Sequence, residues 1–169
     1  MRLCEMTEQN AREICGWKYA DEYAVYNYPD WETLQDRKWA IADSERRRNE
    51  FYSVFSQQNN LVAYFRLVRQ SDGLLLGLGM KPEYCGKGFG GAFMALIVRY
   101  AQQNFPGNNL QLDVREFNRR AIKCYEKAGF QTAERHFKKT PAVSGWFVRM
   151  VLKPDSVTDD TAGKSDLQE

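Results

Sequence analysis

Apolar and polar residues follow two regular spacings along most of the chain, and these spacings predict a mixed α/β domain. Runs rich in branched and aromatic residues predict strands at 1–6, 51–56, 61–69, 74–80, 110–114, 130–137 and 146–152. Apolar residues at helical spacing predict helices from Thr7 towards Trp17, over 88–104 and from Asn118 to Gly129. Asn118 suits a helix N-cap, and Gly129 suits a helix end.

Three stretches depart from this pattern. The segment from Trp17 to Trp39 is rich in aromatic residues, and Pro29 divides it, so we expect a helix, a loop and a second short helix there. Three consecutive arginines at 46–48 predict a solvent-exposed turn. The residues after Pro154 have no apolar periodicity and predict a flexible tail.

Length and charge favour one globular domain. The 169 residues are enough for a single core, which we expect to span 1–152, followed by an acidic, flexible tail over 153–169. That tail carries two lysines against five acidic residues. The whole chain has a formal net charge of only +2, which gives no electrostatic case for a nucleic-acid partner.

Several other classes of protein are not favoured. The four cysteines have no C-x-x-C spacing and His136 is the single histidine, so we predict no metal site. No apolar run reaches about 18 residues, and charges interrupt the N-terminal segment. We therefore expect a soluble, cytoplasmic protein with no membrane partner.

A glycine-rich loop is the strongest chemical signal. It lies between a predicted strand and a predicted helix, where backbone N–H groups can bind a phosphate or pyrophosphate. Its residues are Gly86, Lys87, Gly88, Phe89, Gly90 and Gly91. A P-loop is excluded because glycine follows the lysine, where Ser or Thr is required. The loop also spells G-x-G-x-x-G, so a small dinucleotide-binding protein is an alternative, although the chain has no length for a second nucleotide-binding half.

Two segments resemble the signatures of the GCN5-related N-acetyltransferase (GNAT) superfamily. Residues 80–90 resemble its pyrophosphate loop, and residues 118–130 resemble its motif Asn-x-x-Ala-x-x-x-Tyr-x-x-x-Gly-Phe. Residues 110–115 are similar to a segment of the ribosomal-protein N-terminal alanine acetyltransferase branch. The resemblance implies a central, mixed but mostly antiparallel sheet with splayed middle strands, flanked by helices. It also implies transfer of an acetyl group from acetyl-CoA to a primary amine.

The resemblance assigns roles to individual residues. The backbone of the glycine loop would bind the pyrophosphate, and the strand end at Leu78, Gly79 and Met80 would pair with the pantetheine arm. A backbone N–H near Met80 would face the thioester carbonyl as an oxyanion donor. Asn118 and Tyr125 would both contact the arm. Tyr125 would also act as the general acid that protonates the leaving thiolate.

The resemblance identifies the general base and the amine acceptor less clearly. Asp113 is the first candidate for the base, acting through water, with Glu83 and His136 as weaker ones. The aromatic segment 17–39 would line the acceptor pocket, where Asp21 and Glu22 pair with a positive charge or are simply solvated. The acceptor is a small-molecule or peptide amine.

Three further points stay open at this stage. Cys85 stands where the family usually has Gln or Arg, and it is either a neutral replacement or a reactive thiol whose pKa is lowered near a helix N-terminus. A non-catalytic acyl-CoA-binding module of the same fold is the main alternative to an enzyme. The protein is expected to be a monomer or a homodimer, with an exposed edge strand at 146–152 that could pair between subunits.

Overall fold

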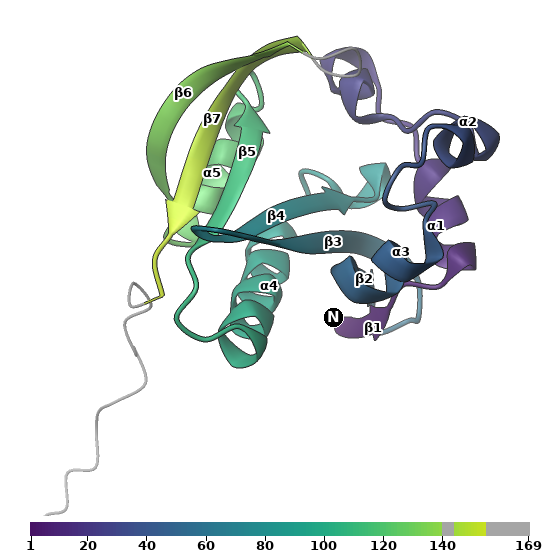
Figure 1. Ribbon diagram of the computed structural model, residues 1–169, viewed down its shortest axis with the longest axis horizontal. Helices are drawn as coiled ribbons and strands as arrows, with labels where there is room; N and C mark the ends of the chain where they lie inside the picture. Colours follow the sequence, from purple (N-terminus) through teal and green to yellow (C-terminus); the bar gives the residue numbers. More distant parts are fainter. Residues whose placement is uncertain (140–143, 155–169) are drawn as a thin grey trace, which may run out of the picture.

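A computed structural model of the chain describes residues 1–139 and 144–154, in which seven strands form one twisted sheet (Figure 1). The strands are β1 (Arg2–Glu5), β2 (Phe51–Phe55), β3 (Leu61–Gln70), β4 (Gly73–Met80), β5 (Leu110–Arg115), β6 (Gln131–Lys139) and β7 (Ser144–Leu152). The helices are α1 (Glu8–Cys15), α2 (Trp31–Asp36), α3 (Ser44–Glu50), α4 (Gly90–Asn104) and α5 (Arg119–Lys127). Two short 3₁₀ turns, η1 (Asp21–Tyr26) and η2 (Pro82–Tyr84), complete the described elements.

The sheet is mostly antiparallel, with the strand order β1-β2-β3-β4-β5-β7-β6. Only β4 and β5 are parallel neighbours, and every other pair is antiparallel. The expected α/β fold, with its mostly antiparallel central sheet, is therefore confirmed. The dinucleotide-binding alternative is wrong, because that fold needs a doubly wound parallel sheet with a second nucleotide-binding half.

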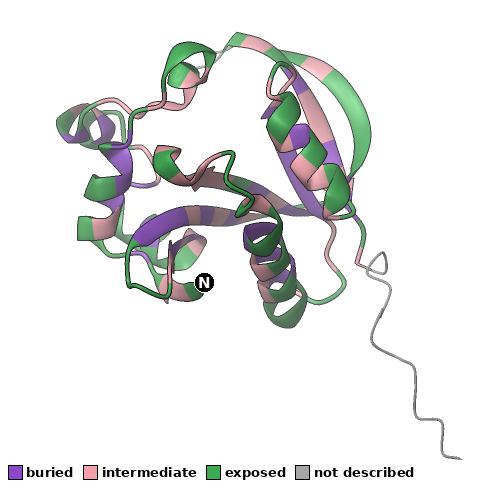
Figure 2. Ribbon diagram, turned by 180° about the vertical axis from the view of Figure 1, so that it is seen from behind, coloured by how far each residue is buried: buried purple, intermediate pink, exposed green. Residues whose placement is uncertain are grey.

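Two clusters of buried side chains lie on opposite faces of the sheet. Helices α4 and α5 cover one face, where Phe93 and Ile97 of α4 pack with Leu76 of β4 and Leu112 of β5. The segments from α1 to α3 cover the other face over β2 and β3, in a smaller cluster of ten buried residues. Figure 2 shows the same division, with buried residues along the strands and exposed residues on the outer faces of the helices.

Local sequence signals account for the first helix. The Thr7 side chain accepts a hydrogen bond from the Asn10 N–H, and the Asn10 side chain accepts one from the Thr7 N–H. This reciprocal pair caps the first turn, as the sequence predicts for Thr7. Asn118 likewise caps α5, and Gly129 follows the helix end at φ +93°, where glycine is favoured.

The arginine-rich segment is a correction to the sequence analysis. It forms α3, not a solvent-exposed turn, and Arg47 is 6% exposed. Its guanidinium donates to the Ile41 carbonyl at 2.9 Å and lies 3.5 Å from the Glu8 carboxylate. A buried cation requires such partners, and a local charge pattern cannot reveal them because both lie on other elements.

The predicted edge strand is a second correction. β7 lies between β5 and β6, and β1 and β6 are the outermost strands among the described residues. The last strand of the described chain therefore inserts into the sheet, and Trp146 is paired with Phe137 of β6. The predicted division into a domain and a flexible tail is untested, because residues 155–169 lie outside the described part.

Candidate active site

The two middle strands of the sheet are paired along only part of their length. Hydrogen bonding between β4 and β5 ends at the pair Leu75–Gln111, whereas β4 continues to Met80. The facing edges beyond that pair are open, and such an edge can bind an extended chain through its backbone N–H and C=O groups. The expected splay is therefore present, and Leu78 and Gly79 lie on its β4 side.

The glycine loop leads directly from this open edge into α4. Gly86 and Gly88 have φ values of +75° and +85°, which glycine adopts without strain. Phe89 is the N-cap of α4 and makes no side-chain capping bond, so the first-turn N–H groups have no side-chain acceptor. A Cβ added at Gly88 or Gly91 would meet nothing within 4 Å. The loop is thus open and aims helix N–H groups at a space where an anion fits.

Positive charge accompanies the loop. Arg120 of α5 lies beside it, since its Nη1 would be 3.8 Å from a Cβ placed on Gly86. Lys87 is exposed within the loop itself. The sequence analysis did not single out Arg120, because its closeness to the loop depends on how α5 packs against α4. Both cations favour binding of a pyrophosphate.

Cys85 does not behave as a reactive thiol. Its Sγ lies 3.4 Å from the Met80 carbonyl and 3.7 Å from the Lys81 carbonyl, with the geometry of a donor. Burial raises the pKa of Cys85, and Arg120 offsets this only in part. Cys85 also follows η2 and does not lie at the first turn of α4. Of the two readings of Cys85, the structure therefore favours a neutral replacement over a thiol with a lowered pKa.

Asn118 and Tyr125 lie together near the open edges, and Tyr26 of η1 lies with them. Asn118 Oδ1 accepts from the Ala121 N–H at 3.2 Å, and its Nδ2 donates to Tyr26 Oη at 3.1 Å. The Tyr125 ring packs on Phe130, with centroids 6.2 Å apart. Burial raises the pKa of Tyr125, and the nearby Cys124 and Tyr26 groups add to the effect. The phenol is therefore protonated throughout the neutral range.

Asp113 lies on the face of β5 opposite the one that α4 and α5 cover, and cations hold it there. Its carboxylate accepts two hydrogen bonds from Arg149 at 2.9 and 3.0 Å and one from Lys138 at 2.5 Å. Burial alone would raise the pKa of Asp113, but these bonds outweigh it and hold the pKa below its usual value. A lowered pKa makes the carboxylate a weaker base. The base role stays a prediction, and the geometry adds a structural role that joins β5, β6 and β7.

Comparison with known proteins adds the family. The sequence model described as the acetyltransferase (GNAT) family matches residues 13–130, which is more than half of the chain. The chain belongs to this family. It is therefore an acetyl-CoA-dependent N-acetyltransferase. The finer resemblance to the alanine acetyltransferase branch stays a prediction, because the family match does not extend to a branch.

Solved structures of the same fold are spermidine N-acetyltransferases of Vibrio cholerae. One, in complex with CoA and spermine, is 18% identical with a TM-score of 0.72, and the match covers 92% of this chain and 96% of that one. A chimera of that enzyme, SpeG, with hSSAT is 20% identical with a TM-score of 0.70, over 90% and 95%. A dodecameric form is 18% identical with a TM-score of 0.69, over 90% and 93%. At these identities the likeness concerns the fold.

The aromatic segment of this acetyltransferase divides between the core and the site. Trp17 and Trp31 are buried in the smaller core cluster. The tyrosines of η1 instead reach across to the other half of the sheet: Tyr23 and Tyr26 pack against Phe117, before α5, with centroids 5.9 and 6.3 Å apart. The segment thus connects the two sides of the splay, a contact that sequence spacing could not reveal.

The remaining polar candidates lie apart from the glycine loop or already have partners. Glu83 is 59% exposed and pairs with Lys81 at 3.2 Å. His136 stacks on Phe147 and lies 3.8 Å from the Asp113 carboxylate, on the same charged face. Asp21 and Glu22 are exposed. None of these groups lies on the open edge of β4.

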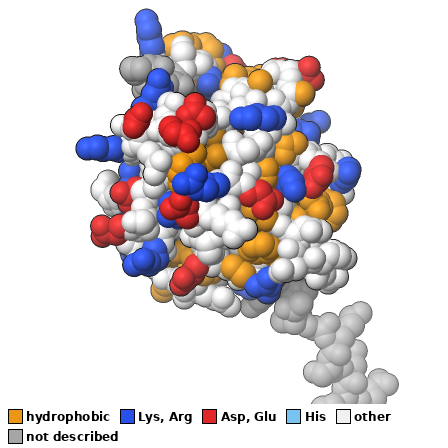
Figure 3. Space-filling model, turned by 90° about the vertical axis from the view of Figure 1, so that its right-hand side faces the viewer, with side chains coloured by type: hydrophobic (Ala, Val, Ile, Leu, Met, Phe, Trp, Pro, Cys, Tyr) orange, Lys and Arg blue, Asp and Glu red, His pale blue; other side chains and the backbone are white. Residues whose placement is uncertain are grey.

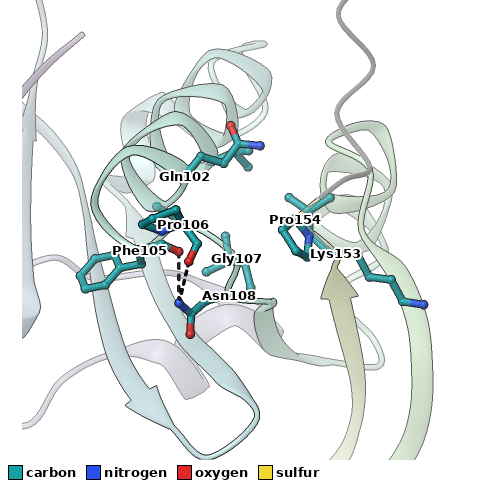
Figure 4. Close-up of a pocket in the computed structure, with 11 residues that line it drawn as sticks. Gln102, Phe105, Pro106, Gly107, Asn108, Lys153 and Pro154 are labelled. Atoms are coloured by element: carbon teal, nitrogen blue, oxygen red, sulfur yellow. Dashed lines mark hydrogen bonds between the residues drawn. The ribbon is translucent and has the colours of Figure 1, made fainter.

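The larger of the two principal cavities is not part of this site. It measures about 290 Å³ and lies at the C-terminal end of α4, between that end and the end of β7 (Figure 4). Phe105, Gly107, Leu110 and Pro154 are among its lining residues. The glycine loop lies at the other end of α4, about 20 Å away along a 15-residue helix. This cavity therefore does not adjoin the groups described above.

The sequence analysis expects no metal site and no membrane partner, and two observations bear on these expectations. Within residues 1–139 and 144–154, no group of three or more His, Cys, Asp and Glu side chains is arranged to hold a metal ion. None of the described helices is long and apolar enough to cross a membrane.

The face that carries α1 to α3 shows acidic and basic side chains interspersed (Figure 3).

The ion pairs of Asp113 with Arg149 and Lys138 allow a test of its structural role. Replacing Asp113 with Asn should lower the free energy of unfolding at pH 7 by about 1–2 kcal/mol, because two partly exposed cations lose a charged acceptor. A carboxyl group with a lowered folded-state pKa stabilises above its unfolded pKa of about 3.9. The difference should therefore be full at pH 7 and shrink as the pH falls below about 4. Urea unfolding at pH 7, 5 and 3 measures it.

The same variant separates the two roles of Asp113. If the carboxylate is the base, the acidic limb of the pH–rate profile disappears in the Asn variant. If that limb is kept while stability falls, Asp113 is structural and not the base. Equal stability of the two proteins at pH 7 would contradict the structural role.

Proposed function

We propose that this acetyltransferase transfers the acetyl group of acetyl-CoA to a primary amine by direct attack within a ternary complex. One observation carries the proposal: the open edge of β4 is followed, after η2 and the glycine loop, by the uncapped N-terminus of α4. Consecutive segments can therefore bind the pantetheine arm through strand-like hydrogen bonds and the pyrophosphate through helix N–H groups. The backbone supplies both contacts, so they do not need the Gln or Arg that Cys85 replaces.

The direction of the arm follows from this arrangement. The pyrophosphate loop follows the C-terminal end of β4, so the arm passes Met80 first and extends towards Leu75, where β5 rejoins β4. The thioester end then lies nearer Leu78 than Met80. The Met80 carbonyl accepts a hydrogen bond from Tyr19 Oη at 2.9 Å, so this carbonyl is not available to accept one from the arm. We accordingly assign the oxyanion donor to a backbone N–H near Leu78.

Tyr125 supplies the proton in this scheme. The amine nitrogen attacks the thioester carbonyl carbon, the C–S bond breaks, and the thiolate accepts the phenolic proton of Tyr125. The raised pKa of Tyr125 means that the phenol carries its proton in the resting enzyme. The proton lost by the amine passes to water, with Asp113 as the proposed base, and the Tyr125 phenolate regains a proton from solvent before the next turnover. Asn118, held by Tyr26, contacts the arm.

The acceptor is a small molecule or a peptide that carries a primary amine. The solved structures named above are spermidine N-acetyltransferases, one of them with CoA and spermine bound, which supports a small-molecule amine. Whether the acceptor is a polyamine is a separate question, and the pocket next to the open edge bears on it.

Thermal unfolding tests the proposal first. Acetyl-CoA or CoA at about 100 times its Kd should stabilise the folded state by about 2.7 kcal/mol, which raises the Tm by about 5–10 °C for a chain of this size. NADH and NADPH are matched controls and should give no shift. Release of free CoA thiol is then measured with a panel of primary amines. A shift with CoA but no thiol release with any amine would favour a non-catalytic acyl-CoA-binding module, and no shift would contradict the proposal.

A further inference from the structure

A second cavity, of about 220 Å³, lies on the face of β3 and β4 opposite α4. Neither the glycine loop nor the proposed acid lines it. Its lining residues are Tyr28, Trp39, Ala40, Ile41, Phe51, Tyr64, Arg66, Gly77 and Leu78. A cavity of about 150 Å³ holds a benzene molecule, so this one has room for an aromatic ring or a short alkyl chain.

The floor of the cavity exists because β4 has glycine at alternate positions. Gly77 and Gly79 face the same side of the sheet. Gly77 is exposed and pairs across the sheet with Arg66, and a Cβ on it would meet only Arg66 Cβ, at 3.9 Å. The Tyr64 ring lies directly on Gly79, where a Cβ would be 2.5 Å from the ring. Tyr64 therefore forms one wall, and bare backbone at Gly77 forms the floor.

The polar groups around the cavity already satisfy one another. Tyr28 Oη and Tyr64 Oη are hydrogen bonded at 3.0 Å. Arg66 is ion-paired with Glu50, with Nε and Nη2 at 2.6 and 2.5 Å from the same carboxylate oxygen. What the cavity offers a ligand is thus more apolar than polar, and its apolar part includes the ring of Trp39. A second ammonium group placed here would lose hydration beside a guanidinium, and the Glu50 carboxylate near it is already paired with Arg66 and Arg46.

The position of the cavity relates it to acetyl transfer. Gly77 and Leu78 lie on β4 beyond its last pair with β5, where the arm extends towards its thioester end in the proposed function. A group held in the cavity is therefore next to the reacting carbonyl, on the face of β4 opposite α4. An amine on a short linker from that group can reach the thioester.

We propose that this cavity binds the non-reacting part of the acceptor, and that the acceptors are primary amines carrying one uncharged alkyl or aryl group. This inference rests on the proposed function and narrows its substrate class. It separates this enzyme from a polyamine acetyltransferase, because a polyamine would place a second cation in an apolar cavity bordered by Arg66.

Matched amines test the inference by binding, without need of turnover. Pentylamine and 1,5-diaminopentane, and hexylamine and 1,6-diaminohexane, are titrated by calorimetry into the protein saturated with CoA. We expect each monoamine to bind at least about 10-fold tighter than its diamine, with a gain of about fourfold per added CH₂ from butylamine to hexylamine. Equal binding, tighter binding of the diamines, or no binding of either class would overturn the inference.

Two variants and one control test whether the alkyl group of the amine binds in this cavity. Trp39→Ala should weaken hexylamine binding about 10-fold or more, whereas Trp146→Ala, the same change at an exposed position on β7, should leave it unchanged. Gly77→Val fills the floor and should weaken the binding of hexylamine. The CoA-induced rise in Tm is measured for every variant. That rise also shows that each variant is folded. Equal loss in Trp39→Ala and Trp146→Ala would overturn the inference, whereas absence of the rise in the unmodified protein would contradict the proposed function instead.

Discussion

Tyr125→Phe should lower kcat about 100-fold or more and leave the affinity for CoA nearly unchanged. A general acid contributes about 10²–10⁴-fold to a rate, and the change removes only the hydroxyl that carries the proton. The ring stays packed on Phe130, so the fold and the CoA site should persist. Single-turnover rates of thiol release at saturating amine, with CoA affinity from calorimetry, measure the two effects separately.

Tyr100→Phe is the matched control for this variant. It removes a phenolic hydroxyl from α4, where the Tyr100 ring packs against Tyr52 and Phe65 on the core side. Its kcat should equal that of the unmodified enzyme. An unchanged kcat in Tyr125→Phe at saturating substrate would remove Tyr125 as the acid. Because burial raises the pKa of Tyr125, its deprotonation should produce no fall in rate below about pH 10.

Gly90→Ala should lower the free energy of unfolding by about 2 kcal/mol, or the Tm by about 4–8 °C. A Cβ at Gly90 would lie 2.8 Å from Cys124 Sγ, so the Cys124 side chain must rotate or α4 and α5 must separate where they meet, and we expect the latter. The start of α4 would move with them, and CoA should bind more weakly. Chemical denaturation and CoA titration measure the two losses.

The clash has a specific rescue and a matched control. Cys124→Ala removes the sulfur, so the double variant should regain most of the stability that Gly90→Ala loses relative to Cys124→Ala alone. Gly91→Ala adds a Cβ to the next residue of the same helix, where nothing lies within 4 Å, and should not destabilise the protein. Equal losses in Gly90→Ala and Gly91→Ala would show that helix contact is not the cause.

The sequence was informative wherever the signal lies within one short segment. Thr7 predicts the start of α1 because its capping partner is three residues away. The glycine loop and the Asn118 cap are equally local, and both occur where predicted. Arg47 shows the limit: its partners, Ile41 and Glu8, lie on other segments, so the arginine run is compatible with either a solvated turn or a buried helix until the fold is known.

The features of the candidate site also fall into two groups, those predicted from a short segment and those that depend on distant contacts. By itself, the sequence determined the open glycine loop, its place between strand and helix, and the spacing of Asn118 and Tyr125 on one helix, because backbone conformation and helical periodicity are local properties. The resemblance implied that the middle strands splay apart, and the tertiary structure added the point of separation, after Leu75. Only the tertiary structure showed that Tyr26 contacts Asn118 and that Asp113 is paired with cations of β6 and β7. It also created the apolar cavity over Gly77. These features depend on contacts between residues distant in the chain, whose geometry is set by how the whole sheet and its helices pack.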